Sequence, residues 1–199
     1  MPGDLADPIT FGLLAAPILA RAGIRCALYG GLALGVYGRA RLTADADFAV
    51  AAVDAGRLVA AFAAAGLHAE ANFDALPHGG LLLARATVFG RGEWTGSNVI
   101  DVVAPRDAAY AELALDRSLP LQLRGTALAI LAPEDFVVFK ALSDRPIDIE
   151  DAASVLVRMG PDLDLTGIEQ QVSAASRRVK LVDVWGRWTQ IQQRARELG

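Results

Sequence analysis

The 199-residue sequence is poor in cysteine and histidine. Its single cysteine, Cys26, excludes an intrachain disulfide and a cysteine-rich zinc cluster, which fits a reducing compartment. Cys26 lies in an apolar stretch, so we expect a buried small side chain rather than a nucleophile. The two histidines, His68 and His78, have neither the spacing of a His-x-x-x-His motif nor that of a catalytic triad. Histidine-based chemistry is therefore not expected.

The sequence also lacks the features of a membrane or exported protein. No apolar run approaches the ~20 residues that span a bilayer, and the longest candidate, residues 11–20, contains Pro17. The first seven residues lack the basic start of a signal peptide. We therefore expect a cytoplasmic location and no membrane partner. The net charge of -4 argues against a surface that generally coats nucleic acid.

The pattern of apolar residues, glycines and prolines predicts two parts. Residues 1–131 read as a mixed α/β half, and residues 132–199 read as a helical half that can pack against the sheet as one unit. Pro133-Glu134-Asp135 is typical of a helix start. The expected helices of the first half cover residues 8–22, 31–37, 54–65 and 107–115, and the expected strands cover residues 25–29, 45–51, 81–89, 98–103, 121–124 and 127–131.

Three aspartates in apolar strand contexts are the main chemical signal. Asp45 and Asp47 are two residues apart, and alternate residues of a strand share one face. Asp101 lies in the middle of a second apolar strand, where a carboxylate is costly unless it is paired, exposed or bound to a metal. If the two strands pair, the three carboxylates converge. Such a cluster suits Mg²⁺ or Mn²⁺, because hard cations prefer oxygen ligands.

A glycine pair, Gly30-Gly31, follows an expected short strand and opens an expected helix. That arrangement can aim backbone N–H groups at phosphate oxygens. The alternative is that the glycines only allow close helix packing. The sequence after the pair matches neither a Walker A loop nor a Rossmann fingerprint.

Taken together, these motifs resemble the nucleotidyltransferase superfamily with the DNA-polymerase-β-like fold. The resemblance rests on Gly30-Gly31, on Asp45-Ala46-Asp47 and on Asp101. The form Gly-Gly-x-Ala followed by Arg-x-Thr-x-Asp-x-Asp is especially similar to the AbiEii-type toxin nucleotidyltransferases. Related families also carry an acidic helix start, a lysine and an arginine–aspartate pair, and this chain has in that order Pro133-Glu134-Asp135, Lys140, Arg145, Asp148 and Asp151.

The resemblance implies a small mixed β-sheet core flanked by helices and a role for each motif. Asp45 and Asp47 would bind the ions, and Asp101 would complete the metal site and could accept a proton. Gly30-Gly31 would hold the β- and γ-phosphates of a nucleoside triphosphate.

Four further residues are candidate phosphate ligands. Arg39, Arg41 and Thr43 precede the aspartate strand and could contact the triphosphate, or they could be part of a solvated loop. Lys140 could reach phosphate, or it could be an ordinary exposed lysine.

Asp148 and Asp151 are expected to supply acid to a helix N-terminus. The basic residues near the C-terminus are expected on a solvated face, with contact to RNA as the alternative. Trp185 and Trp188 are expected to pack rather than to stack on bases.

The leading hypothesis is a metal-dependent nucleotidyltransferase that moves a nucleoside monophosphate from a nucleoside triphosphate to an acceptor hydroxyl. The acceptor could be RNA, a protein or a small molecule, and the resemblance implies a toxin with an antitoxin partner. Two alternatives stay open: a non-catalytic module of this fold that binds a nucleotide or a partner, and an aminoglycoside-type small-molecule nucleotidyltransferase.

Overall fold

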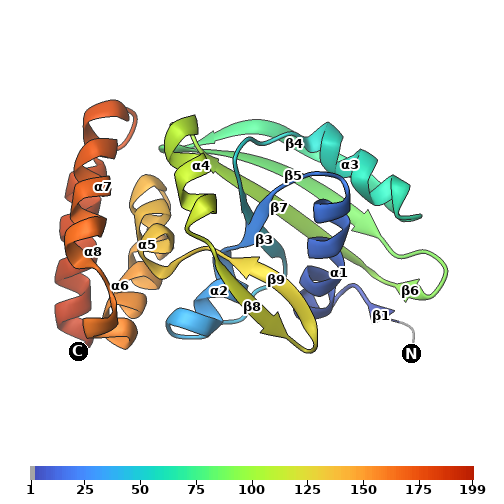
Figure 1. Cartoon of the computed structure of the whole chain (residues 1–199), viewed down its shortest axis with the longest axis horizontal. Coiled ribbons are helices and arrows are strands. Elements are labelled where there is room, and N and C mark those ends of the chain that lie inside the picture. The colour runs from blue at the N-terminus through green and yellow to red at the C-terminus, as the bar shows by residue number, and fades with distance from the viewer. Residues whose placement is uncertain (1–2) are drawn as a thin grey trace.

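A seven-stranded mixed sheet runs through the computed structural model, which describes residues 3–199 (Figure 1). The strand order is β4-β5-β7-β3-β2-β9-β8. These strands are β2 (Cys26–Leu28), β3 (Ala46–Val50), β4 (His68–His78), β5 (Leu81–Phe89), β7 (Ser97–Pro105), β8 (Leu119–Leu123) and β9 (Thr126–Ile130). A separate short ladder joins β1 (Gly3–Asp4) to β6 (Trp94–Thr95) in parallel. The predicted mixed α/β class is confirmed.

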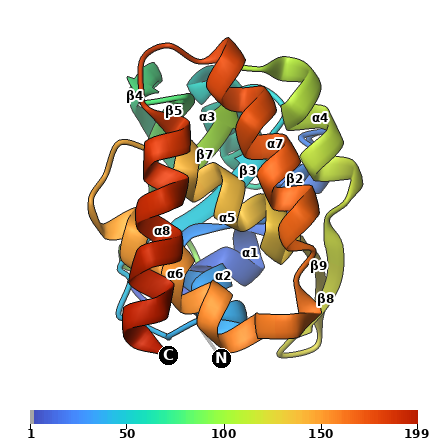
Figure 2. The ribbon, with the colours of Figure 1, turned by 90° about the vertical axis from the view of Figure 1, so that its left-hand side faces the viewer.

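Helices flank this sheet, and the C-terminal ones gather at one end of it (Figure 2). In the described chain the helices are α1 (Pro8–Arg21), α2 (Gly30–Tyr37), α3 (Ala55–Ala64), α4 (Ala108–Asp116), α5 (Pro133–Leu142), α6 (Ile147–Met159), α7 (Leu165–Arg178) and α8 (Val184–Leu198), with a 3-10 turn at Gly160–Asp162. The predicted helical C-terminal region is confirmed. Every helix within residues 3–199 is too short or too polar to cross a membrane.

The two faces of β3 have different surroundings. Ala46 and Phe48 are buried beneath α1, which in turn packs against α3 through the stacked rings of Phe11 and Phe62. Asp47 lies between Ala46 and Phe48 in the strand and therefore points to the opposite face. One face of β3 thus contributes to the core, and the other carries the acidic side chain.

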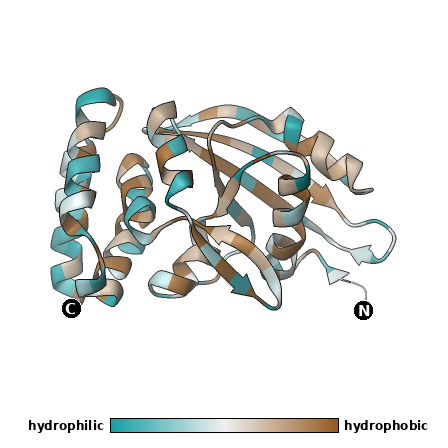
Figure 3. Ribbon diagram, viewed as in Figure 1, coloured by the Kyte–Doolittle hydropathy of each residue, from teal (hydrophilic) through white to brown (hydrophobic). Residues whose placement is uncertain are grey.

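The helices α6, α7 and α8 are amphipathic, whereas α5 is buried on almost all sides and packs against both them and the sheet. Phe136 and Phe139 of α5 pack against Tyr29, with ring centroids 5.3 and 5.5 Å apart. Trp188 is buried, as predicted, whereas the side chain of Trp185 is 47% exposed. Much of the visible outer surface of α7 and α8 is hydrophilic (Figure 3). The two-part division at residue 131 stays a prediction, because packing alone does not separate two domains from one.

The strand β4 was not among the strands predicted from the sequence. Its residues are mostly exposed on both sides, so they lack the alternation that predicts a half-buried strand. Its pairing with β5 is also interrupted by two register shifts, and Ala75, which lies within the second of them, has a positive φ of 49°. Such bulges and the proline at position 77 are typical of an edge strand. Hairpin pairing with β5, across the turn at Gly79 and Gly80, rather than an alternating pattern of its own, makes this segment a strand.

Candidate active site

The three aspartates lie together on adjacent strands. β3 and β7 are parallel, and Asp47 is directly opposite Asp101. Asp45 stands one residue before β3. One carboxylate oxygen from each of the three residues lies within 4.8 Å of the others. The predicted convergence is confirmed, and all three donors are hard oxygens of the kind that a divalent cation prefers.

The electrostatics of this cluster are unfavourable without a cation. Burial raises the pKa of Asp47 to about 7, and repulsion from Asp45 and Asp101 adds to the rise. Lys140 and a hydrogen bond from the backbone N–H of Gly31 oppose it. A carboxyl that is costly to ionise among two other carboxylates is one that a bound cation would stabilise. The residues present therefore fit a divalent metal.

Gly30 and Gly31 allow the cluster to form. Gly30 has a φ of +58°, and a Cβ on it would lie 1.9 Å from Asp47 Oδ2. A Cβ on Gly31 would lie 2.6 Å from the Cβ of Thr43. The glycines were predicted to bring phosphate close to the backbone. In this structure they bring Asp47 and Thr43 close to the start of α2.

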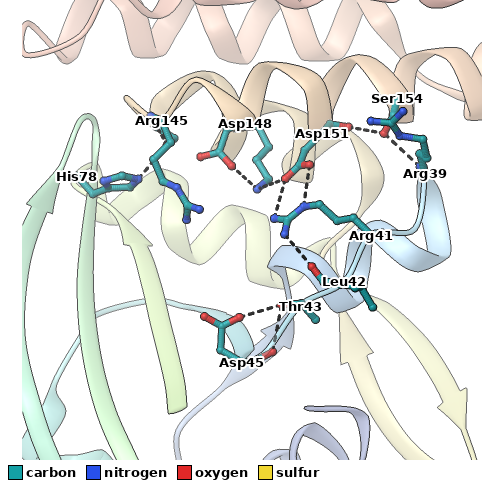
Figure 4. A network of polar contacts seen from close by, with 12 residues as sticks. Arg39, Arg41, Leu42, Thr43, Asp45, His78, Arg145, Asp148, Asp151 and Ser154 are labelled. Atoms are coloured by element: carbon teal, nitrogen blue, oxygen red, sulfur yellow. Dashed lines mark hydrogen bonds and ion pairs between the residues drawn. The ribbon is translucent and has the colours of Figure 1, made fainter. Parts of the chain in front are cut away.

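The loop before β3 orients Asp45. Thr43 donates a hydrogen bond from Oγ1 to Asp45 Oδ1 at 2.8 Å. Figure 4 shows this pair, with Leu42 next to it in the loop. The side chain of Arg39 is exposed, and its backbone N–H donates to Ser154 Oγ at 3.2 Å. Thr43 is therefore placed to hold a candidate metal ligand, whereas Arg39 meets α6 through its backbone.

An ion network that is buried except for Arg41 ties the same loop to the C-terminal helices (Figure 4). Arg41 binds both carboxylate oxygens of Asp151, at 3.1 and 3.2 Å. Lys140 Nζ donates to Asp148 at 2.6 Å and to Asp151 at 3.1 Å. The ammonium group also lies 5.1 Å from the ring centroid of Tyr29. Arg41 and Lys140, both predicted phosphate ligands, already have carboxylate partners.

The interpretation of Asp148 and Asp151 as helix-terminal acids was incomplete. Asp148 does lie in the first turn of α6. Both side chains are nevertheless buried, with only about 3% of each residue exposed. The positive charge of Lys140 keeps the pKa of Asp148 low against the opposing effect of burial. Their contacts are those of an ion network and not of a solvated helix end.

Arg85 is a site residue that the sequence did not reveal. It lies on β5 directly opposite Asp101, and its Nε and Nη2 each donate to that carboxylate at 2.7 Å. Its Nη2 is also 3.9 Å from Asp45 Oδ2. The available signal was a lone arginine in the apolar run of residues 81–89. The register that sets it against Asp101 depends on pairing between distant segments.

Two cavities lie on opposite faces of the sheet. The one at the acidic cluster has a volume of about 30 Å³, and Asp47, Asp101, Lys140 and Arg145 line it. That is room for an ion or a water molecule, so a nucleotide would have to extend over its open side. Figure 4 shows the side chain of Arg145 extending toward the side where Asp45 lies.

The second cavity is larger and lacks the clustered carboxylates of the first. Its volume is about 620 Å³, and it is lined by α1, β2 and β9 together with Phe48. It contains no carboxylate, and burial raises the pKa of its one thiol, Cys26, to about 12. The thiol is therefore not activated, in agreement with the expectation that Cys26 is not a nucleophile, although Cys26 is half-buried and not fully buried as predicted.

No protein-family model and no curated protein matches the chain. The chain is similar to an antigenic nucleotidyltransferase-like protein from Paracoccidioides brasiliensis, with a TM-score of 0.49 and 16% identity over 89% of this chain and 91% of that one. It is also similar to ANT(2")-Ia in complex with adenylyl-2"-tobramycin, with a TM-score of 0.44 and 15% identity over 85% of this chain and 97% of that one. Likenesses this weak do not assign a substrate, so the chemistry has to come from the residues of the site.

Proposed function

We propose that this protein is a metal-dependent nucleotidyltransferase. It would transfer a nucleoside monophosphate from a nucleoside triphosphate to an acceptor hydroxyl. The acceptor oxygen forms a bond to the α-phosphorus, the bond to the β-phosphate oxygen breaks, and pyrophosphate leaves. The observation that carries the proposal is the convergence of Asp45, Asp47 and Asp101 on two parallel strands beside the start of α2.

The metal would be held by the oxygens of the three aspartates. When bound, Mg²⁺ or Mn²⁺ neutralises charge on the phosphates and polarises the phosphorus centre. Thr43 keeps Asp45 oriented, and the N–H of Gly31 does the same for Asp47. These contacts set the positions of the ligands before a substrate arrives, and preorganisation of this kind lowers the barrier to phosphoryl transfer.

Asp101 has a more restricted role than the sequence implied. Both of its oxygens accept hydrogen bonds from Arg85, and its side chain is only 6% exposed. A metal ion or the proton of the acceptor would therefore compete with Arg85 for the lone pairs of Asp101. Asp45 and Asp47 are therefore the first ligands in our proposal, and Asp101 completes the set.

Triphosphate binding would involve the cations around the cavity. Arg145 lines the cavity and Arg39 is exposed beside the loop, so both can donate to phosphate oxygens. Arg41 and Lys140 act through the network that holds the loop before β3 and through the positive field they place near Asp47. Gly30-Gly31 would contribute the N-terminal dipole of α2.

The acceptor is the open part of the proposal. An RNA end, a protein side chain and a small molecule all carry suitable hydroxyl groups, and a toxin role with an antitoxin partner follows from the motif resemblance alone. A non-catalytic module that binds a nucleotide is the second candidate. The contact between Arg85 and Asp101 favours it, because this contact occupies both oxygens of one of the three acids.

The test is a transfer assay with labelled nucleoside triphosphates. Each of the four would be incubated with Mg²⁺ or Mn²⁺, the full chain and pools of RNA, protein and small molecules, and both labelled product and pyrophosphate would be measured. We expect metal-dependent transfer by the wild type and a loss of several orders of magnitude in Asp47→Asn, because the variant loses a charged metal ligand.

A matched control is Asp54→Asn, which changes an aspartate at the N-cap of α3, away from the cluster. It should fold and retain transfer. Metal-dependent nucleotide binding without transfer to any pool would favour the binding module. If the folded wild type binds no nucleotide, both candidate functions, the transferase and the nucleotide-binding module, are excluded.

A further inference from the structure

The guanidinium of Arg85 lies where a cation bridging two of the acids would lie. It binds Asp101 through two hydrogen bonds of 2.7 Å, and Nη2 is 3.9 Å from Asp45 Oδ2. The contact comes from strand register, because Arg85 and Asp101 are direct neighbours on β5 and β7. Arg85 therefore supplies positive charge to the acidic cluster.

Arg85 also has a second contact that does not depend on Asp101. Its Cζ lies 5.5 Å from the ring centroid of Phe73, its neighbour on β4. A guanidinium over an aromatic face is attracted by the ring. With about 36% of its side chain exposed, Arg85 is on the open side of the cluster and not locked in the core. The side chain can leave Asp101 and still have a partner.

We propose that Arg85 is an internal counter-cation that competes with the metal ion for Asp101. It stabilises the acidic cluster when no ion is bound, and it has to release Asp101 when one binds. This inference rests on the proposed function, since it takes the three aspartates as metal ligands. It identifies a residue that sets the affinity of the site for divalent ions.

Competition between Arg85 and the metal ion predicts the direction in which the metal affinity changes when Arg85 is replaced. A divalent ion at the cluster repels the guanidinium and replaces its two hydrogen bonds to Asp101. Removing the positive charge should therefore tighten metal binding, on the order of tenfold for a unit charge a few ångströms from a divalent ion. The same change should destabilise the metal-free protein, because Asp101 is left buried without a partner. If Arg85 instead only oriented Asp101, its removal would weaken metal binding.

The test measures Mn²⁺ binding by calorimetry and the melting temperature of the metal-free full chain. Arg85→Gln should bind Mn²⁺ about tenfold more tightly than the wild type, and its metal-free form should melt at a lower temperature. Arg85→Lys keeps the charge but loses the fork that holds both oxygens, so its affinity should be intermediate. If the glutamine variant does not fold, the lysine variant tests the proposal, because it should also bind Mn²⁺ more tightly than the wild type.

Arg117→Gln is a matched control. Arg117 also binds an aspartate, Asp135, with both ends of its guanidinium, and its exposure of 38% is close to that of Arg85. This variant should lose thermal stability while its affinity for Mn²⁺ stays at the wild-type value. The control separates general loss of an ion pair from a specific effect on the metal.

Two results would overturn the inference in distinguishable ways. Equal or weaker Mn²⁺ binding by Arg85→Gln, with clear binding by the wild type, rejects the competition and leaves the proposed function standing. Absence of Mn²⁺ binding in both folded proteins at millimolar metal rejects the competition and the proposed metal site together.

Discussion

Gly30 and Asp47 are packed so closely that a methyl group on the glycine would lie 1.9 Å from the carboxylate oxygen of the aspartate. The contact links the first residue of α2 to the acidic face of β3. Because Gly30 also has a φ of +58°, any other residue there is strained before its side chain is considered.

We predict that Gly30→Ala abolishes the response to metal. The added Cβ has to displace Asp47, and this moves the central ligand of the cluster. The measurement is the Mg²⁺-dependent shift in melting temperature. Gly35→Ala is the control, because no atom outside its own helix and its neighbours lies within 4 Å of a Cβ at that position of α2. That variant should keep the shift and gain about 0.5–1 kcal/mol of stability. A normal metal shift in Gly30→Ala would contradict this account of the glycine pair.

The stabilisation by Mg²⁺ should depend on pH. The pKa of Asp47 in the folded protein is about 7, against an ordinary value of 3.8. The folded state therefore binds the proton more tightly than the unfolded chain, so the contribution of Asp47 to stability falls as the pH rises from about 4 to about 7. Mg²⁺ has to replace that proton below pH 7. We expect a larger metal-induced increase in melting temperature at pH 8 than at pH 5.5.

Asp47→Asn is the control for this pH dependence, because asparagine does not titrate. In the metal-free state the variant should be more stable than the wild type at pH 8, since it removes a carboxylate that is costly to ionise. An equal Mg²⁺ effect at pH 5.5 and pH 8 in the wild type would count against the raised pKa.

Replacing Lys140 should destabilise the fold strongly. Lys140→Met leaves Asp148 and Asp151 buried with one of their cations removed, and breaking a buried pair in this way costs about 3–5 kcal/mol. Urea denaturation measures the effect. Lys180→Met removes an exposed lysine whose ammonium donates to the carbonyl of Ser176 at 3.4 Å, so we expect a change within about 0.5 kcal/mol. A loss below about 1 kcal/mol in Lys140→Met would mean that water reaches the network.

Cys26 should react slowly with alkylating reagents in the folded protein. Burial raises the pKa of its thiol from 9.0 to about 12. The thiolate fraction at pH 8 is then about a thousandfold lower than for an unperturbed thiol, and the rate falls with it. Mass spectrometry of iodoacetamide-treated protein, with and without urea, measures this. Equally fast labelling in both conditions would show that the thiol is accessible and unperturbed.

The sequence predicted the acidic cluster because its signals are local. Asp45 and Asp47 share a strand face, and Asp101 interrupts an apolar strand, where a carboxylate is costly unless it is paired, exposed or bound to a metal. The expected helices and most of the strands follow from the same kind of local pattern. The helix expected over residues 54–65 is an example, since α3 begins where the side chain of Asp54 accepts a hydrogen bond from the backbone N–H of Arg57.

What the sequence could not predict depends on register and packing over long distances. Arg85 reaches Asp101 because of the pairing of β5 with β7, and no local signal sets that register. Arg41 meets Asp151 across 110 positions of the chain. For both arginines the missing information was which segments meet and in which register. The strand β4 is a different case: it has no alternation of its own, and it exists because it forms a hairpin with β5, its neighbour in the sequence.

The link between Arg41 and Asp151 has a consequence for the order in which the protein becomes functional during synthesis. A chain leaves the ribosome from its N-terminus and folds as it lengthens. The strands that carry the three aspartates are complete once Pro105 has emerged, whereas Lys140 and Asp151 follow later. A nascent chain can therefore gather its carboxylates well before the network that holds the loop ahead of Asp45 can form. The site would reach its final geometry only after α6 has been made, which delays any activity until most of the protein exists.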